Sequence, residues 1–264
     1  MDKPKHPTIL KIVSLLQKAQ HAVVLTGAGI STPSGIPDFR SPDSGIWKRY
    51  DPAEVATLSA FRHNPTTFYH WLHLLAEKII QAEPNPAHLA LAQLEQAGKI
   101  KALITQNIDG LHQKAGAKLV IEVHGTFQTL VCIRCYRKYR SNDHDNPNIY
   151  SSIIDAYLHD DLIPHCPGCG SILKPDIILF EEQLPALSWI EAQQACRKCD
   201  LLIIAGSSLE VMPVAGLPMR ALENGARLVS INKTATYIDV RADAILQEDV
   251  AEVLPQIAEA VLNG

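Results

Sequence analysis

The part of this sequence that most restricts the fold is a run of strand-forming residues followed at once by a glycine-rich turn. Residues 22–26 (AVVLT) lead directly into residues 27–32 (GAGIST). This order is typical of the first turn of a dinucleotide-binding unit, in which backbone N–H groups hold phosphates. Thr32 stands where a third glycine would let helix and strand pack closely, and Pro33 and Pro37 stop a long helix from starting there. The sequence therefore predicts a phosphate-binding turn followed by a loop that lies over the ligand.

Short apolar runs alternate with helical patterns along the rest of the chain. Apolar residues recur at helical spacing from Ile9 to Leu16, and residues 87–95 also have a helical pattern. Further strand candidates are residues 100–104, 120–123, 177–180, 201–205 and 228–231. Continuous apolar strands separated by helices indicate a parallel sheet covered on both faces. We therefore expect an α/β fold with a doubly wound, Rossmann-like parallel sheet.

Two segments interrupt this alternation and predict added modules. Residues 41–82 carry six large aromatic side chains and are interpreted as a small helical insertion. Residues 125–175 carry two Cys-x-x-Cys pairs and are interpreted as an inserted zinc ribbon. The remaining residues, 1–40, 83–124 and 176–264, are expected to form the Rossmann-like domain.

Four cysteines form two pairs with the spacing of metal knuckles, Cys132 with Cys135 and Cys166 with Cys169. Four thiolates make a closed tetrahedral site of the kind that holds structural zinc. The 30 residues between the pairs exceed the usual ~15–20, and the polar stretch 141–148 accounts for the excess.

A third pair, Cys196 and Cys199, lies in or just after a helical stretch and lacks Gly or Pro. We expect these two thiols only to pack. The histidines at His144, His159 and His165 are expected to be solvated loop residues.

Composition narrows the function classes. The 264 residues include no apolar run of ~20, so a membrane span is not expected. The two early lysines are not followed by the apolar stretch of a secretory signal. Six cysteines without such a signal indicate a reducing compartment, and we expect a cytoplasmic protein. The formal net charge of −4 gives no general attraction to nucleic acid.

Further motifs complete a pattern shared with a known family. They are residues 105–112 (TQNIDGLH), residues 121–125 (IEVHG), the two cysteine knuckles, and residues 206–211 (GSSLEV). Together with residues 27–40 (GAGISTPSGIPDFR), they resemble the sirtuin family of NAD-dependent protein deacylases. The motifs occur in the family's order, and the resemblance extends from about Ala22 to the last helix. It implies NAD as co-substrate, structural zinc, and acyl-lysine proteins or peptides as partners.

The resemblance also implies which residues hold NAD. Residues after the first strand and after the second form the ribose and nicotinamide pocket, and those after the later strands hold the adenosine half. The expected contacts are Gly27, Ala28, Gly29, Thr32, Asp38, Phe39, Arg40, Gln106, Asn107, Ile108, Asp109, Gly206, Ser207, Ser208, Asn232, Lys233 and Val250.

Three of the expected site residues are predicted to take part in catalysis. His124 ends an apolar strand and precedes Gly125, and the resemblance makes it the base for a ribose hydroxyl. Asp109 is expected to grip the nicotinamide carboxamide and to act with Asn107, while Phe39 shields the reacting sugar from water. His112 is expected to pack or cap instead.

A strand-like mode of peptide binding is implied between residues 177–182 and the loop after Ser208, with main-chain hydrogen bonds that make little demand on sequence. The expected contacts are Ile178, Phe180, Glu181, Leu209 and Val211. Glu181 departs from the family because many relatives have glycine there. Its carboxylate suggests a preference for basic residues beside the target lysine.

The sequence also predicts which acyl groups the protein removes. In the family branch that removes succinyl or malonyl groups, a Tyr and an Arg bind the distal carboxylate, and those positions fall on Leu72 and Leu75. Acetyl and longer neutral groups are therefore expected.

Two alternative functions stay open. They are a protein ADP-ribosyltransferase on the same scaffold and a non-catalytic NAD- or zinc-dependent binding module. A hydride-transferring dehydrogenase is not expected, because Thr32, Pro33 and Pro37 depart from the dehydrogenase pattern.

Overall fold

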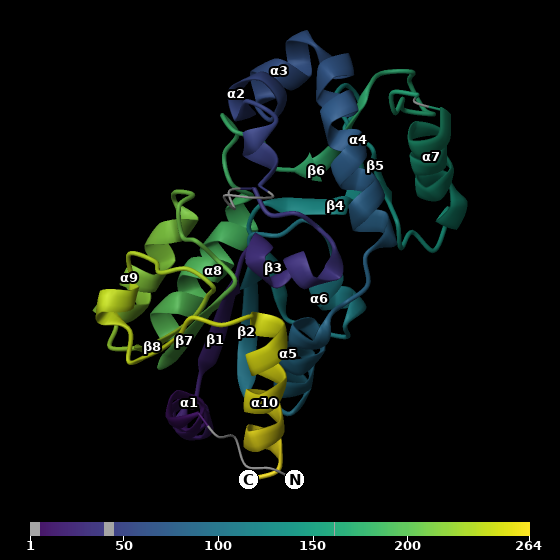
Figure 1. Cartoon of the computed structure of the whole chain (residues 1–264). Coiled ribbons are helices and arrows are strands. Elements are labelled where there is room, and N and C mark those ends of the chain that lie inside the picture. The colour runs from purple at the N-terminus through teal and green to yellow at the C-terminus, as the bar shows by residue number, and fades with distance from the viewer. Residues whose placement is uncertain (1–5, 40–44, 161) are drawn as a thin grey trace.

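A parallel sheet of six strands, in the order β3-β2-β1-β7-β8-β9, forms the larger lobe (Figure 1). The computed structural model describes residues 6–39, 45–160 and 162–264. The strand bounds are Ala22–Thr26 (β1), Ile100–Thr105 (β2), Val120–Glu122 (β3), Leu201–Ala205 (β7), Arg227–Ile231 (β8) and Ala244–Leu246 (β9). The strand order reverses between β1 and β7, and loops at the carboxyl ends of neighbouring strands diverge at such a switch point.

Helices cover both faces of this sheet because its central strands are apolar on both sides. One face packs against α1 (Pro7–Lys18), α5 (Pro86–Gln96) and α10 (Val250–Leu262), through residues such as Val24 and Ile203. The other face packs against α8 (Ala186–Lys198) and α9 (Leu217–Glu223), through Val23 and Leu202. In Figure 1, α10 and α5 lie together on one side and α8 and α9 on the other. The expectation of a doubly wound α/β fold is confirmed.

The smaller lobe combines two separate stretches of the chain around one core. Its sheet is antiparallel, with the order β5-β4-β6. The strands are Gly125–Cys132 (β4), Lys138–Arg140 (β5) and Leu173–Ile177 (β6), and the helices are Pro52–Val55 (α2), Leu58–His63 (α3), Pro65–Gln81 (α4) and Pro147–Asp160 (α7). Phe68 and Leu72 of α4 share a buried cluster with Leu130 of β4 and Tyr157 of α7. The helical insertion and the cysteine-rich segment therefore pack together above the main sheet (Figure 1).

Three details differ from the sequence expectations. The strand expected at residues 177–180 is wrong, since β6 ends at Ile177 and belongs to the small antiparallel sheet. Backbone groups beyond Ile177 are taken by other partners, among them the Glu182 carboxylate that accepts from the N–H of Leu179 at 2.9 Å. The gap between the cysteine pairs holds the helix α7 as well as the polar stretch, and β9 had no sequence prediction.

None of the helices in the described ranges combines the length and the apolar character that crossing a membrane requires.

Candidate active site

A cavity of about 1220 Å³ opens at the carboxyl ends of β1, β2, β7 and β8 and continues toward the smaller lobe. It is lined by the predicted nucleotide-binding residues that the structure describes, from Gly27 on the first loop to Val250 at the start of α10. Arg40 lies outside the described residues. The parallel topology has thus brought loops that are far apart in sequence to one edge of the sheet.

Two glycine turns meet backbone to backbone at the centre of this edge. The N–H of Gly29 donates to the carbonyl of Gly206 at 2.8 Å. Gly206 has a φ of +63°, and a Cβ there would lie 2.4 Å from the backbone nitrogen of Ile30. A Cβ on Gly27 would lie 2.9 Å from the Cβ of Ser207. The glycines are therefore required by the close approach of the two turns.

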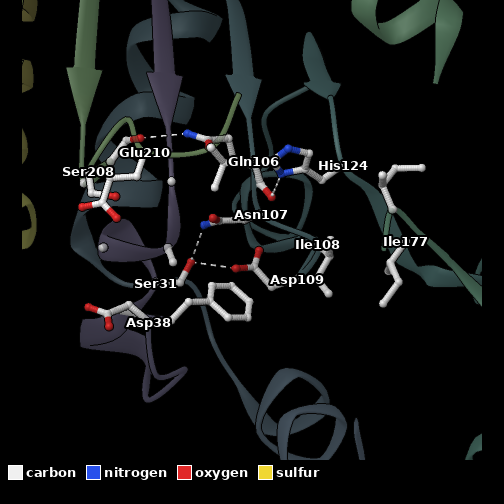
Figure 2. Close-up of a pocket in the computed structure, with 18 of the residues that line it drawn as sticks. Ser31, Asp38, Gln106, Asn107, Ile108, Asp109, His124, Ile177, Ser208 and Glu210 are labelled. Atoms are coloured by element: carbon white, nitrogen blue, oxygen red, sulfur yellow. Dashed lines mark hydrogen bonds between the residues drawn. The ribbon is translucent and has the colours of Figure 1, made fainter. Parts of the chain in front are cut away.

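A buried polar network occupies the next part of the cavity. Ser31 Oγ donates to Asp109 Oδ2 at 2.7 Å and accepts from Asn107 Nδ2 at 3.0 Å (Figure 2). Burial raises the pKa of Asp109, while hydrogen bonds from the Leu111 N–H and from Ser31 oppose the rise. The network fixes both side chains predicted to face the nicotinamide and its ribose.

His124 lies beside this network. Among the described residues, one of its ring nitrogens has a hydrogen-bond partner and the other has none. Its Nδ1 lies 3.1 Å from the carbonyl oxygen of Gln106 (Figure 2). Because a carbonyl only accepts, Nδ1 carries the proton and the lone pair is on Nε2. Burial lowers the pKa of His124, and the Gln106 carbonyl opposes this. The imidazole is therefore neutral at pH 7, the state that a general base needs.

The opposite end of the cavity is held by hydrogen bonds between three strand ends. Gln106 Nε2 donates to Ser207 Oγ at 2.8 Å, and the N–H of Ser207 donates to Asn232 Oδ1 at 2.7 Å. Lys233 also lines the cavity and pairs with Asp249 Oδ2 at 2.8 Å. These contacts give the end of the cavity that is predicted to hold adenosine a defined shape.

The residues predicted to bind peptide lie at the cavity mouth, with one exception. Ile178, Phe180, Glu181 and Val211 line the cavity. The side chain of Leu209 does not, because it is 4% exposed and packs in the core beneath α8 and α9.

An aromatic and aliphatic wall closes the cavity toward the smaller lobe. Phe39 stacks on Trp47 with ring centroids 5.1 Å apart, and Trp47 stacks on Trp71 at 5.9 Å. Trp71, Leu75 and Ile79 follow one another at helical spacing along α4 and line the cavity. Leu72 is fully buried in the lobe and is not among the lining residues.

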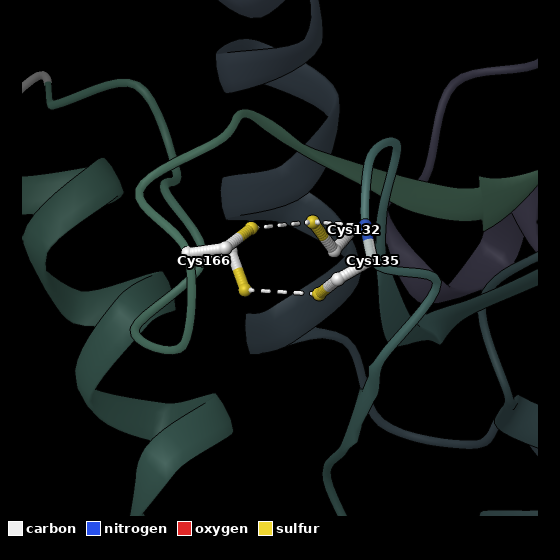
Figure 3. Close-up of side chains that lie close together, drawn as sticks. Cys132, Cys135 and Cys166 are labelled. Carbon is white, nitrogen blue, oxygen red and sulfur yellow. Dashed lines mark hydrogen bonds between the residues drawn. The ribbon is translucent and has the colours of Figure 1, made fainter.

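The four predicted metal-binding cysteines lie together in the smaller lobe. Their sulfur atoms are all within 4.8 Å of one another (Figure 3). Although burial opposes it, hydrogen bonds from the Tyr139 hydroxyl and the Gly168 N–H lower the pKa of Cys166 to about 6. Four converging sulfurs without a further ligand position fit structural zinc. Cys196 and Cys199 are buried between α8 and the sheet and are not part of this cluster, as predicted.

Comparison with known proteins assigns the family. The model of the Sir2 family matches residues 27–213. This chain belongs to the Sir2 family.

Members of the Sir2 family resemble the chain over almost its whole length. A protein named NAD-dependent protein deacylase 2 from Archaeoglobus fulgidus is 43% identical over 254 residues, which are 96% of each chain. The NAD-dependent protein deacetylase of Thermodesulfovibrio yellowstonii is 40% identical over 264 residues, covering 99% of this chain and 98% of its own. A solved complex of Sir2 with a p53 peptide and NAD+ has a TM-score of 0.84 at 37% identity, covering 96% of this chain and 98% of that one.

The structure also shows that Ser31 and His88 belong to the site, although the sequence did not lead us to predict them. Ser31 connects Asn107 to Asp109. His88 lies 3.5 Å from Ser31 Oγ, and its ring is 4.9 Å from that of His112. The one sequence signal for Ser31 is its place in the glycine-rich motif. His88 carries the weaker signal of a capping position, three residues after the Asn85 that begins α5.

Proposed function

We propose that this chain is an NAD-dependent protein-lysine deacetylase. The reaction converts an acetyl-lysine peptide, NAD and water into free lysine, nicotinamide and O-acetyl-ADP-ribose. The observation that carries the proposal is the single cavity in which the neutral imidazole of His124 and the Ser31-centred network with Asn107 and Asp109 line the same space. The activities named for the Sir2 relatives support it.

Asp109 and Asn107 hold the reactive end of NAD in this proposal. The Asp109 carboxyl and the Ile108 backbone grip the nicotinamide carboxamide, and Asn107 orients the ribose. Phe39 excludes water while the bond to nicotinamide breaks. Its stacking on Trp47 supports this role because the stack holds the ring at the cavity wall.

His124 acts as the general base. The acyl oxygen of the substrate is the nucleophile, so the protein supplies none. His124 Nε2 takes a proton from a ribose hydroxyl, which then attacks the amide carbon. The bond from Nδ1 to Gln106 supports this assignment because it fixes the tautomer that leaves Nε2 able to accept.

The remaining assignments follow the same pattern. Gly206, Ser207, Ser208 and Asn232 hold the adenosine half, and the peptide lies along Ile178, Phe180 and Val211. Cys132, Cys135, Cys166 and Cys169 hold one structural zinc. The module boundaries near residues 41–82 and 125–175, the cytoplasmic location and the lack of a nucleic acid partner stay predictions.

One product analysis tests the function. The protein is incubated with NAD and an acetyl-lysine peptide, and all products are weighed by mass spectrometry. Free lysine together with O-acetyl-ADP-ribose is expected. A protein or peptide heavier by one ADP-ribose would favour the transferase alternative, and unchanged NAD and peptide would favour a binding module.

A further inference from the structure

The segment 178–182 at the cavity mouth is attached to the smaller lobe from two directions. On the side of β6, Glu182 Oε2 accepts from the N–H of Leu179 at 2.9 Å and pairs with Lys174 Nζ at 2.8 Å. The N–H of Ile178 donates to the carbonyl of His124 at 2.8 Å. This part of the segment is therefore fixed relative to the catalytic histidine.

On the opposite side, Glu181 attaches the segment to the helical insertion. Its Oε2 accepts from the Ser59 N–H at 2.9 Å and from Ser59 Oγ at 2.6 Å. Two backbone bonds accompany it, from the Phe180 N–H to the Ala56 carbonyl and from the Leu58 N–H to the Phe180 carbonyl, both 3.0 Å long. The Glu181 side chain thus extends a backbone contact between the mouth segment and the start of α3.

Both hydrogen bonds from Ser59 reach the same oxygen of the Glu181 carboxylate, Oε2. Hydrogen bonds from the Ser59 hydroxyl and N–H, with smaller contributions from Arg62 and His63, lower the pKa of Glu181. A basic residue of a peptide would meet a carboxylate that is already anchored to Ser59. These contacts support a positioning role, and the recognition of flanking basic residues that the sequence suggests is tested separately below.

The backbone of Glu181 explains why this contact matters. Its φ is +74°, in the left-handed region that favours glycine. A residue with a Cβ is strained there, and it keeps this backbone conformation only where its surroundings hold it. The two hydrogen bonds to Ser59 provide that hold.

We propose that Glu181 is a positioning residue for peptide binding, which holds the segment 178–182 on the helical insertion through Ser59 and does not read the charge of the peptide. This inference rests on the proposed deacetylase function. It assigns a structural role to a residue whose backbone lies in the left-handed region.

The first test separates peptide binding from the chemical step. Ser59→Ala and Glu181→Gln should each raise the KM and Kd of an acetyl-lysine peptide by about three- to tenfold, the scale of a charge-assisted hydrogen bond near the surface. The kcat and the KM for NAD should stay within about twofold, because the chemical groups are untouched. Ser59→Thr restores the hydroxyl and should recover wild-type values. Glu54→Gln removes the same charge from an exposed site on α2 and is the matched control.

The second test uses backbone strain and peptide charge. Glu181→Ala keeps the strain and loses the hydrogen bonds, so it should weaken peptide binding more than Glu181→Gly, which relieves the strain. Two peptides are compared, one with alanines and one with arginines beside the acetyl-lysine, and Glu181→Gln should weaken both equally.

The outcomes separate this inference from the proposed function. A loss confined to the arginine peptide, or a Ser59→Ala variant with wild-type peptide affinity, would overturn the positioning role. Failure of the wild-type protein to deacetylate either peptide would refute the proposed function, while the Kd values for peptide still decide the role of Glu181.

Discussion

The two ends of the cavity are built in different ways. At the proposed nucleotide end, neighbouring strands of one sheet deliver the side chains, and contacts such as that between Ser31 and Asp109 are buried. At the proposed peptide end, three separate parts of the chain meet, and several contacts are exposed, such as that between Glu181 and Ser59.

From this difference we infer that the two ends of the cavity have different tasks. A reacting sugar needs groups held to a fraction of an ångström, which a continuous sheet and a buried network provide. At the end proposed to receive peptides of varied sequence, the shape of the cavity depends on how three separate parts of the chain pack together. The following predictions test whether the two ends depend on different parts of the structure, beginning with the largest expected effect.

The zinc cluster should control the whole peptide end. Cys132→Ser should abolish stoichiometric zinc and unfold the smaller lobe, because the binding energy of a structural site is part of the folding energy. Activity should be lost completely. Metal analysis and circular dichroism check this, with Cys196→Ser as the control that keeps one zinc per chain. Loss of zinc from the control would contradict the choice of cysteines.

His124→Ala should separate chemistry from structure at the nucleotide end. Removing the general base should lower kcat by about 10²–10⁴-fold while NAD affinity and folding stay nearly unchanged. Rapid-quench assays and NAD titration measure the two quantities. Turnover near the wild-type rate would exclude His124 as the base.

Gly206→Ala should damage the contact between the two turns. The new Cβ would lie 2.4 Å from the Ile30 nitrogen at a φ of +63°, so we expect a loss of about 2–5 kcal/mol in the free energy of unfolding. Gly225→Ala has a similar positive φ, +85°, with no atom within 4 Å, and should lose only about 1–2 kcal/mol. Urea unfolding compares the pair, and equal losses would mean that the close approach is unimportant.

Acid should weaken the nucleotide end through two buried histidines. Burial lowers the pKa of His88 to about 4 and, with the charge of His88 as a smaller cause, that of His112 to about 3. Since the unfolded state binds more protons below pH ~6.5, stability is full above that pH and falls as pH drops toward 4. We expect a loss on the order of a few kcal/mol over this range. Urea midpoints should fall less steeply with pH in His112→Gln, and an equal slope would refute the assignment.

The preference for one acyl group over another should depend on the residues of α4 that line the cavity. Leu75 lines the cavity, and by the sequence resemblance it takes the position of the cation in the succinyl-removing branch. Tyr69 is not available because its hydroxyl donates to the Leu173 carbonyl. Among the described lining residues the one Lys or Arg is Lys233, which is paired with Asp249 at the other end. An unpaired buried carboxylate is disfavoured, so kcat/KM should be at least about tenfold lower for succinyl- than for acetyl-lysine. A preference for succinyl would contradict this.

Much of this architecture was predictable because local patterns carry it. The alternation of apolar strands and helices, the glycine turn after β1 and the spacing of the cysteine pairs each indicate a structure without knowledge of distant contacts. The motifs also pointed to His124, Asn107 and Asp109, which the fold brings to one cavity.

Other features depend on contacts between residues far apart in sequence, and only the tertiary structure decided them. The end of β6 at Ile177 depends on side chains that take the next backbone groups, and the burial of Leu209 depends on how its turn meets the core. His88 joins the site because α5 packs beneath the first turn. Glu181 turns toward Ser59, 122 residues away in sequence. A local pattern can predict an element and its exposed face, but the partner of a polar side chain is set by how distant elements dock.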